Sequence, residues 1–333
     1  MNERITFSTQ SAELKNKVLA FIDEWNSTTE TITVTTSGST GIPKQTEILK
    51  SHMEISAKKT LNYFALKPGD TALLCLSTDT IAGKMMIVRS IVGKLNLIVG
   101  DVNSHPLQNV EHRTDFIALV PLQVEELLKS AVEKLQSIRT ILIGGGPIHT
   151  SLSTKLREQN IQAFHSYGMT ETISHVAIRK LGRGETDSFE ALDGIAFSHQ
   201  NSKLCVHYPE IGLPTLSTND LVELIDEKHF KFIGRADFIV NSGGVKLNPE
   251  TVEELLSSHI ECSFFVSGIP DEQLGQRLIL LIEGSIAQAP TLFELKALLP
   301  KFHNPKEIYF LPTFVRTESG KINRLETLKL ISN

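Results

Sequence analysis

The chain reads Thr36-Ser37-Gly38-Ser39-Thr40-Gly41-Ile42-Pro43-Lys44 directly after the β-rich run Ile32-Thr33-Val34-Thr35. Glycines let a backbone curl with its N–H groups pointing inward, hydroxyl side chains add donors, and Lys44 adds a compact positive charge. This combination predicts a loop that holds a polyphosphate. It does not match the P-loop pattern G-x-x-x-x-G-K-[ST], because Pro43 precedes the lysine and Gln45 follows it. A flexible linker rich in serine and glycine is the alternative.

Apolar runs on both sides of this loop predict an α/β architecture. Residues 31–36 are expected to form a strand. Further strands expected at 71–76, 95–99, 115–120 and 139–143 alternate with helices near 82–93, 121–135 and 149–159. This alternation predicts a covered, mainly parallel sheet. A capping box at Ser51-His52-Met53-Glu54 predicts a further helix that ends near Ala65.

The pattern changes in the second half of the chain. From about Gly182, shorter strands separated by turns, clearest at 203–208 and 221–225, predict a small β-rich subdomain. After residue 236 the expected elements are a helix at 249–258, strands at 262–268 and 277–283, a helix at 291–299 and a strand at 306–310. We therefore expect a large N-terminal domain, residues 1–236, and a compact α+β C-terminal domain, residues 237–333.

Composition excludes several classes of protein. The 333 residues are 41% hydrophobic and 21% charged, which fits a globular chain, and the net charge of -5 gives no general attraction for nucleic acid or an anionic membrane. Cys75, Cys205 and Cys262 lie far apart without metal-ligand spacing. No signal-peptide core or membrane-length apolar run occurs. We expect a cytoplasmic protein with no nucleic-acid partner and no membrane insertion.

The opening loop resembles the T-S-G-[ST]-T-G-x-P-K signature of the adenylate-forming enzymes, which include acyl-CoA synthetases, adenylation domains of peptide synthetases, and luciferases. Further segments resemble the later motifs of that family in the same order, so the resemblance extends over residues 31–324. It implies an acetyl-CoA synthetase-like fold, in which the small C-terminal domain is mobile, and a reaction that uses ATP, Mg²⁺ and coenzyme A. The loop Thr36–Lys44 would then hold the β- and γ-phosphates of ATP.

The segment His165-Ser166-Tyr167-Gly168-Met169-Thr170-Glu171-Thr172 resembles the Y-G-x-T-E signature, where a strand is expected to end and a helix to begin. Ligands bind at such strand ends in open α/β sheets. The resemblance implies that Tyr167 stacks on adenine, Thr170 hydrogen-bonds the α-phosphate and Glu171 holds the Mg²⁺ bound to ATP. The alternative is an ordinary helix N-terminus, capped by Thr170, with Glu171 complementing the helix dipole.

Two shorter segments resemble the rest of a nucleoside site. The run Ile143-Gly144-Gly145-Gly146-Pro147 resembles the G-G-x-P loop beneath the adenine, although glycine runs more often mark a simple turn. In Ser217-Thr218-Asn219-Asp220 the family usually has T-G-D, whose aspartate binds both ribose hydroxyls. Asn219 replaces the glycine, and asparagine tolerates a left-handed backbone. An Asn-Asp turn without a ligand is the alternative.

The longest match runs from Gly234 to Glu250 and resembles a family segment that opens with G-R-x-D and continues through a glycine turn to a proline and a glutamate. It implies that Arg235 contacts ribose or phosphate, that Asp237 is the hinge between the two domains, and that Gly243-Gly244 line the channel for the pantetheine arm of CoA after the small domain has rotated. An ordinary β-hairpin followed by a helix that starts with proline explains the same pattern, and it is compatible with a hinge.

The segment Arg316-Thr317-Glu318-Ser319-Gly320-Lys321-Ile322-Asn323-Arg324 resembles the closing motif of the family. By resemblance, Lys321 bridges the substrate carboxylate and the α-phosphate, where its charge stabilises the charge that develops during attack. A solvated basic segment near the C-terminus is the alternative. The implied reaction converts a carboxylate and Mg·ATP into an acyl-adenylate and pyrophosphate. A thiol, expected to be that of CoA, then displaces AMP.

Only 35 residues precede Thr36, far fewer than in full-length members of the family. In this the chain resembles the short o-succinylbenzoate-CoA ligases of menaquinone biosynthesis, and the segment 76–90 resembles their acyl-pocket region. Lys84 and Arg89 are candidate cations for a substrate with a second carboxylate. Five residues apart on a helix, they do not share a face, so we expect at least one of them at the surface or facing phosphate. His175 is a candidate for the border of the acyl site, or an ordinary packed histidine.

Three other interpretations remain. The chain is also compatible with a ligase for another small or aromatic acid. A truncated, catalytically weak nucleotide-binding homologue would explain the short N-terminus and Asn219, but Glu171 and Lys321 argue against it. An adenylation domain that serves a peptidyl carrier is disfavoured because no carrier segment follows.

Overall fold

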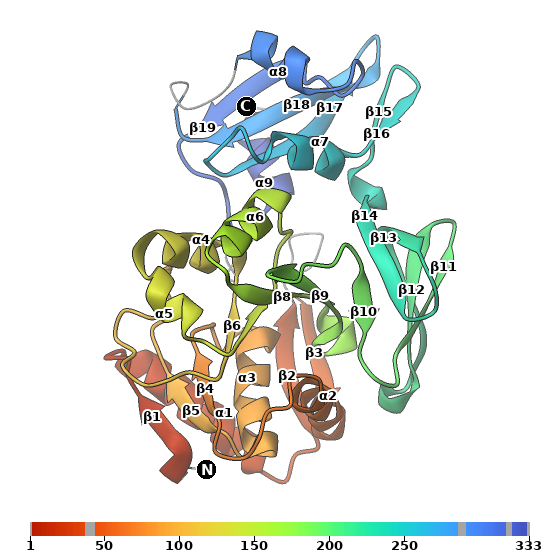
Figure 1. The fold of residues 1–333 in the computed structure, drawn as a ribbon. Coiled ribbons are helices and arrows are strands. Elements are labelled where there is room, and N and C mark those ends of the chain that lie inside the picture. Colours follow the sequence, from red (N-terminus) through yellow and green to blue (C-terminus); the bar gives the residue numbers. More distant parts are fainter. Residues whose placement is uncertain (1, 37–43, 286–290, 318–321, 332–333) are drawn as a thin grey trace.

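The computed structural model describes residues 2–36, 44–285, 291–317 and 322–331, which form a large lobe and a small lobe (Figure 1). A mixed twelve-stranded sheet runs through the large lobe. One half is parallel, in the order β1 (Ile5–Phe7), β5 (Asn96–Val99), β4 (Thr71–Leu74), β6 (Phe116–Leu119), β7 (Thr140–Ile143) and β8 (Gln162–Gly168). The predicted covered parallel sheet is therefore present, as one half of a larger sheet.

The other half of the sheet is antiparallel. It continues from β8 through β9 (His175–Gly182), β10 (Phe189–Ala191), β14 (His229–Arg235), β13 (Leu213–Leu224), β12 (Lys203–Tyr208) and β11 (Ala196–Gln200). The β-rich region expected after Gly182 thus extends the main sheet and does not form a sheet of its own. The reason is that β9 returns along β8 and offers its free edge to the strands that follow.

Helices cover both faces of the parallel half. They are α1 (Ala12–Asn26), α2 (Lys50–Tyr63), α3 (Ile81–Gly93), α4 (Pro121–Ser130), α5 (Val132–Gln136) and α6 (Thr150–Glu158). Neighbouring strand residues serve opposite faces, since Leu73 packs in one buried cluster and Leu74 in the other. The helix predicted at 121–135 is interrupted at Ala131, whose φ of -153° is not helical.

The capping box predicted at Ser51 is wrong. Helix α2 begins at Lys50, its N-cap is Leu49, and no side chain caps it. The cause is the hairpin of β2 (Thr31–Thr36) and β3 (Lys44–Leu49), in which Thr31 pairs with Leu49 and leaves no residue between strand and helix. The backbone N–H of Lys50 instead bonds the carbonyl of Glu30 at 2.9 Å.

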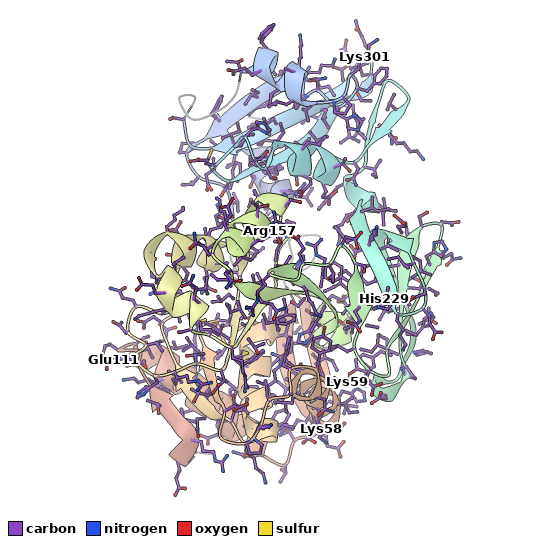
Figure 2. The ribbon with its side chains drawn as sticks, viewed as in Figure 1. Lys58, Lys59, Glu111, Arg157, His229 and Lys301 are labelled. Carbon is purple, nitrogen blue, oxygen red and sulfur yellow. The ribbon has the colours of Figure 1, made fainter. Side chains whose placement is uncertain are left out.

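Helix α2 joins the two halves of the sheet through one side chain. Lys58 is exposed, whereas Lys59 is buried, and its Nζ lies 2.7 Å from Oε1 of Glu210 and 2.6 Å from the carbonyl of Asp193 (Figure 2). Burying a charged amine is tolerated when it is paired and hydrogen-bonded in this way.

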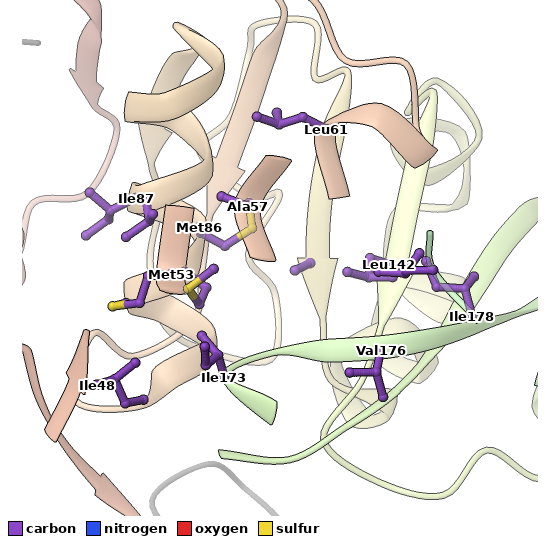
Figure 3. Close-up of a cluster of buried hydrophobic side chains, with 14 of the residues drawn as sticks. Ile48, Met53, Ala57, Leu61, Met86, Ile87, Leu142, Ile173, Val176 and Ile178 are labelled. Atoms are coloured by element: carbon purple, nitrogen blue, oxygen red, sulfur yellow. The ribbon is translucent and has the colours of Figure 1, made fainter. Parts of the chain in front are cut away.

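The core of the large lobe reaches directly beneath the predicted nucleotide site. Met53 of α2 and Met86 of α3 belong to the same buried cluster as Ile173, which follows the Y-G-x-T-E segment (Figure 3). Packing from α2 and α3 therefore supports the turn that carries Thr170 and Glu171.

The small lobe holds the elements predicted for it, in the predicted order. The predicted elements are α7 (Pro249–Leu256), β17 (Phe264–Asp271), β18 (Gly275–Glu283), α8 (Leu292–Leu298) and β19 (Glu307–Leu311). The hairpin of β15 (Val240–Ser242) and β16 (Val245–Leu247) precedes them, and α9 (Arg324–Lys329), which was not predicted, follows them. Alternate residues of β18 pack on the two faces of its sheet: Leu280 lies in one cluster and Leu281 in the other. In the described part of the chain, no helix has the length and apolarity needed to cross a membrane.

Candidate active site

Two of the predicted motifs meet at the carboxyl edge of the parallel strands. Gly144 follows β7 and Gly168 ends β8, and these strands are parallel neighbours with Ile143 paired to His165. Ser166 donates a hydrogen bond to the carbonyl of Ile143 at 3.1 Å. A Cβ at Gly144 would lie 2.4 Å from Oγ of Ser166, so a side chain there would displace this hydroxyl from its bond to Ile143.

The turn after β8 differs from the predicted helix. Thr170–Thr172 form a single 3-10 turn, and the chain then returns as β9. Thr172, and not Thr170, provides the cap, since its hydroxyl accepts from the N–H of Met169 at 3.0 Å. Ile173 has φ of +70°, a strained conformation for a β-branched residue. Strain of this kind concentrates at functional sites.

Glu171 sits in this turn with an exposed side chain. Within the described residues its carboxylate has neither an ion-pair partner nor a hydrogen bond, and no group of three potential metal ligands occurs. A hard, unpaired carboxylate suits Mg²⁺, which is commonly bound by one or two carboxylates together with phosphate oxygens. The donor set therefore fits a cation that arrives with a nucleotide and does not fit a closed metal site.

Tyr167, Asp220, Arg235 and Asp237 form one polar network beside this turn. The Tyr167 hydroxyl donates to Oδ2 of Asp220 at 2.5 Å, and a guanidinium nitrogen of Arg235 lies 3.5 Å from Oδ1 of Asp220. Arg235 also binds both carboxylate oxygens of Asp237, at 2.9 and 2.7 Å. The network joins the predicted adenine, ribose and hinge residues.

Burial controls the protonation of this network. It raises the pKa of Asp220, while the hydrogen bond from Tyr167 and the charge of Arg235 oppose the rise. Burial and the nearby Asp220 raise the pKa of Tyr167 as well, so its hydroxyl stays a donor. Asp220 lies within β13, opposite Arg235 of β14, and not in the turn that its sequence suggested. Asn219 accordingly does not use a left-handed backbone.

Arg89 and His175 are brought together behind the strand end. Both lie against the hydroxyls of Thr60 and Ser174: Arg89 donates at 3.2 and 2.5 Å, and the ring nitrogens of His175 lie at 3.2 and 3.3 Å. His175 pairs with Gly168 across β8 and β9, which sets this cluster directly behind the Tyr167–Glu171 turn. The sequence did not reveal Thr60 or Ser174, because no motif contains them.

The guanidinium of Arg89 is 3% exposed and forms no ion pair with any carboxylate of the described residues. Burial lowers its pKa to about 9, so it remains charged at neutral pH. Burial and the charge of Arg89 keep the pKa of His175 well below its usual value, so His175 is neutral. An uncompensated buried cation is costly, and this cost points to an anionic ligand.

Lys84 is separated from this cluster. Its Nζ donates to the carbonyl of Thr33 in β2 at 3.0 Å and lies 5.2 Å from the centre of the Phe21 ring. It therefore faces the hairpin whose connection carries the predicted phosphate loop. The spacing of Lys84 and Arg89, which does not give them an ideal common face, is consistent with this separation.

Other predicted site residues are placed only in part. Thr36 and Lys44 form the last pair of the β2–β3 hairpin, while Ser37, Gly38, Ser39, Thr40 and Gly41 lie outside the described residues, as does Lys321. Gly243 and Gly244 form the β15–β16 turn with φ of +57° and +81°, and the N–H of Gly243 bonds the carbonyl of Leu274 at 2.9 Å.

Comparison with known proteins gives a consistent picture. A family model described as AMP-binding enzyme matches residues 8–230. The 2-succinylbenzoate–CoA ligase of Escherichia coli K12 is 26% identical over 87% of this chain, which spans 66% of that enzyme. A crystal structure of an acyl-CoA synthetase (AMP-forming)/AMP-acid ligase II-like protein from Dyadobacter fermentans is 31% identical, with a TM-score of 0.64, over 97% of this chain and 96% of that one. The fold also resembles that of O-succinylbenzoate coenzyme A synthetase from Bacillus subtilis, solved with ATP and magnesium ion. The TM-score is 0.75 at 23% sequence identity, and the match covers 89% of this chain and 69% of that one.

Proposed function

The chain belongs to the AMP-binding enzyme family, and on that premise we propose that it is an ATP-dependent acid–CoA ligase for a substrate with two carboxylates, with o-succinylbenzoate as the leading candidate. In the first half-reaction a carboxylate oxygen attacks the α-phosphorus of ATP, and the bond to the β-phosphate breaks to release pyrophosphate. In the second, the sulfur of CoA attacks the acyl carbon and AMP leaves.

The observation that carries the substrate class is the unpaired guanidinium of Arg89. It lies behind the turn in which Thr170 and Glu171 are expected to meet the phosphates, and the proposal requires one ligand to span the two places. A substrate that reacts through one carboxylate and places the other on Arg89 would compensate the buried charge. Such charge-assisted hydrogen bonds are roughly twice as strong as neutral ones. The E. coli relative, a 2-succinylbenzoate–CoA ligase, supports the same choice.

Residues of the nucleoside site have defined roles in this proposal. Tyr167 and the Gly144–Pro147 loop enclose the adenine. Asp220 accepts hydrogen bonds from the ribose hydroxyls, and these bonds replace its contact with Arg235. Glu171 would hold Mg²⁺ together with the phosphates, and the bound ion would supply positive charge opposite the leaving group. Thr170 orients the α-phosphate for attack, and positioning of this kind supplies most of the catalysis in phosphoryl chemistry.

The small lobe, residues 237–333, acts as a second domain in this proposal. Lys321 stabilises the charge that develops during the first half-reaction. Asp237 is the hinge, and its bond to Arg235 links it to the ribose site. After rotation, the Gly243–Gly244 turn lines the path of the pantetheine arm. The loop from Thr36 to Lys44 holds the pyrophosphate group that leaves.

Exchange of labelled pyrophosphate into ATP, driven by different acids, tests this proposal. The panel contains o-succinylbenzoate, benzoate, a fatty acid and 4-oxo-4-phenylbutanoate, which has the same succinyl arm without the ring carboxylate. We expect exchange with o-succinylbenzoate, much weaker exchange with 4-oxo-4-phenylbutanoate, and a thioester when CoA is added. Equal exchange with o-succinylbenzoate and 4-oxo-4-phenylbutanoate would contradict the assignment of a dicarboxylate substrate. The chain would then be an acid–CoA ligase for another acid. No exchange with any acid would overturn the ligase itself.

A further inference from the structure

A contact between the two lobes is formed at the start of helix α6. The N-cap residue of α6 is His149, whose side chain makes no capping hydrogen bond. The cap comes from the small lobe: Oε1 of Glu254, on α7, accepts from the backbone N–H of Thr150 at 2.9 Å. Its other oxygen lies 3.3 Å from Nδ1 of His149. A carboxylate at a helix N-terminus satisfies a free N–H and complements the helix dipole.

A second small-lobe residue completes this contact. The ring of Phe264, at the start of β17, stacks on the ring of His149 at 6.1 Å between centres and 14° between planes. Although partial burial opposes it, hydrogen bonds from His149 and Thr150 lower the pKa of Glu254 to about 2. The carboxylate is therefore charged over the whole range in which the chain is expected to work.

Both sides of the contact are fixed within their own lobes. Leu152 and Leu156 of α6 lie in the core of the large lobe, which adjoins the small lobe at this helix (Figures 1 and 2). Val252 and Leu256 of α7 lie in the core of the small lobe. Glu254 thus joins two separately packed cores, and the helix that it contacts begins shortly after the Gly144–Pro147 loop that is expected to lie under the adenine.

The observed orientation suits one half-reaction better than the other. The β15–β16 hairpin, whose turn is Gly243–Gly244, points away from the large lobe (Figure 1). A turn in that position cannot line a path to the carboxyl edge of β7 and β8. The lobe would have to leave the Glu254 contact before CoA could use it.

We infer that Glu254 is a positioning residue that holds the small lobe on α6 in the orientation for acyl-adenylate formation and has to be released before the thioester forms. The inference rests on the proposed function, because it divides that reaction between two orientations. Glu254 lies outside the sequence motifs, and in this inference it sets the balance between the two orientations, and so between the two half-reactions.

Hydrogen exchange tests the contact itself, without any substrate. Glu254→Ala removes the acceptor, Glu254→Gln keeps an oxygen but loses the charge, and Glu272→Gln is a matched control at an exposed site of the same lobe. We expect faster exchange at the amide of Thr150, largest in Glu254→Ala, smaller in Glu254→Gln and absent in the control. Unchanged exchange in Glu254→Ala would overturn the contact.

The two half-reactions, measured separately, test its role. Glu254→Ala is expected to slow acid-dependent pyrophosphate exchange about tenfold, because one hydrogen bond to a charged group contributes about that factor. Thioester formation from supplied acyl-adenylate is expected to stay unchanged or to become faster. Equal slowing of both would mean that Glu254 is merely structural. If the unaltered protein shows no exchange with any acid, the proposed function fails, whereas the amide measurement still reports on the contact.

Discussion

The hydroxyl of Tyr167 lies 2.5 Å from Oδ2 of Asp220 and joins the end of β8 to β13, a strand four places away in the sheet. The two residues are 53 positions apart in the chain, and the proposed function assigns both to one nucleoside site. Their bond shows that the site is preorganised: the acceptor expected for ribose is already held in place by the ring expected beside the adenine.

Replacing Asp220 should therefore weaken nucleotide binding specifically. We expect Asp220→Ala to raise the KM for ATP roughly 10- to 100-fold, because two hydrogen bonds to a charged acceptor are lost. Tyr167→Phe keeps the ring and should have a smaller effect. The KM values come from pyrophosphate exchange at saturating acid. An unchanged KM for ATP in Asp220→Ala would remove the ribose assignment.

Replacing Arg89 should separate substrate binding from stability. Arg89→Met keeps the length of the side chain and removes the buried charge, so we expect an unchanged or higher melting temperature. The KM for a dicarboxylate acid should rise roughly 100-fold, since a charged hydrogen bond contributes several kcal/mol when its partner would be left unpaired. Lys84→Met, on the same helix, is the control and should leave that KM much less affected. A lower melting temperature with an unchanged KM would make Arg89 a structural residue.

Lys321→Ala should suppress adenylation far more than ATP binding, because its charge is needed only as the carboxylate attacks. We expect a loss of roughly 100-fold or more in the rate of pyrophosphate exchange and an ATP affinity, measured by calorimetry, within about threefold of the unaltered protein. Lys329→Ala, which loses only an exposed ion pair with Glu326, is the control. Normal exchange in Lys321→Ala would contradict the assigned role.

Glu250 should make the stability of the small lobe depend on pH. Burial raises its pKa from 4.5 to about 7, although the charge of Arg324 opposes the rise, and its Oε2 has no hydrogen-bond partner among the described residues. Between these pH values the folded chain binds more protons than the unfolded chain, so stability falls as pH rises.

Glu250→Gln should remove that dependence. Relative to the unaltered protein, its free energy of unfolding is expected to increase between pH 4.5 and 7, by up to roughly 3 kcal/mol. Denaturant unfolding at several pH values measures this, with Glu272→Gln as an exposed control. A difference that stays constant with pH would show that Glu250 does not titrate in this range.

Sequence patterns predicted the regular parts of the fold well, because local periodicity decides them. The run at 139–143 became β7 (Thr140–Ile143), and the helix and strands after residue 248 occur as expected. Prediction failed where a neighbouring strand overrode a local signal. The capping pattern at Ser51 lost to the pairing of Thr31 with Leu49, and the β-rich region joined the main sheet because β9 pairs with β8.

The sequence by itself determined which functional groups the chain contains and how they are spaced. They are a loop rich in hydroxyl side chains and glycine, a glycine turn, and a tyrosine, carboxylates and basic residues in recognisable motifs. Only the tertiary structure decided which of them meet. Lys84 and Arg89 are separated because five residues turn a helix by about 140°. Arg89 faces Thr60 and Ser174 because α2, α3 and β9 pack on one core. Burial then gave Arg89 its significance, since a charge without a partner is costly only where water is excluded.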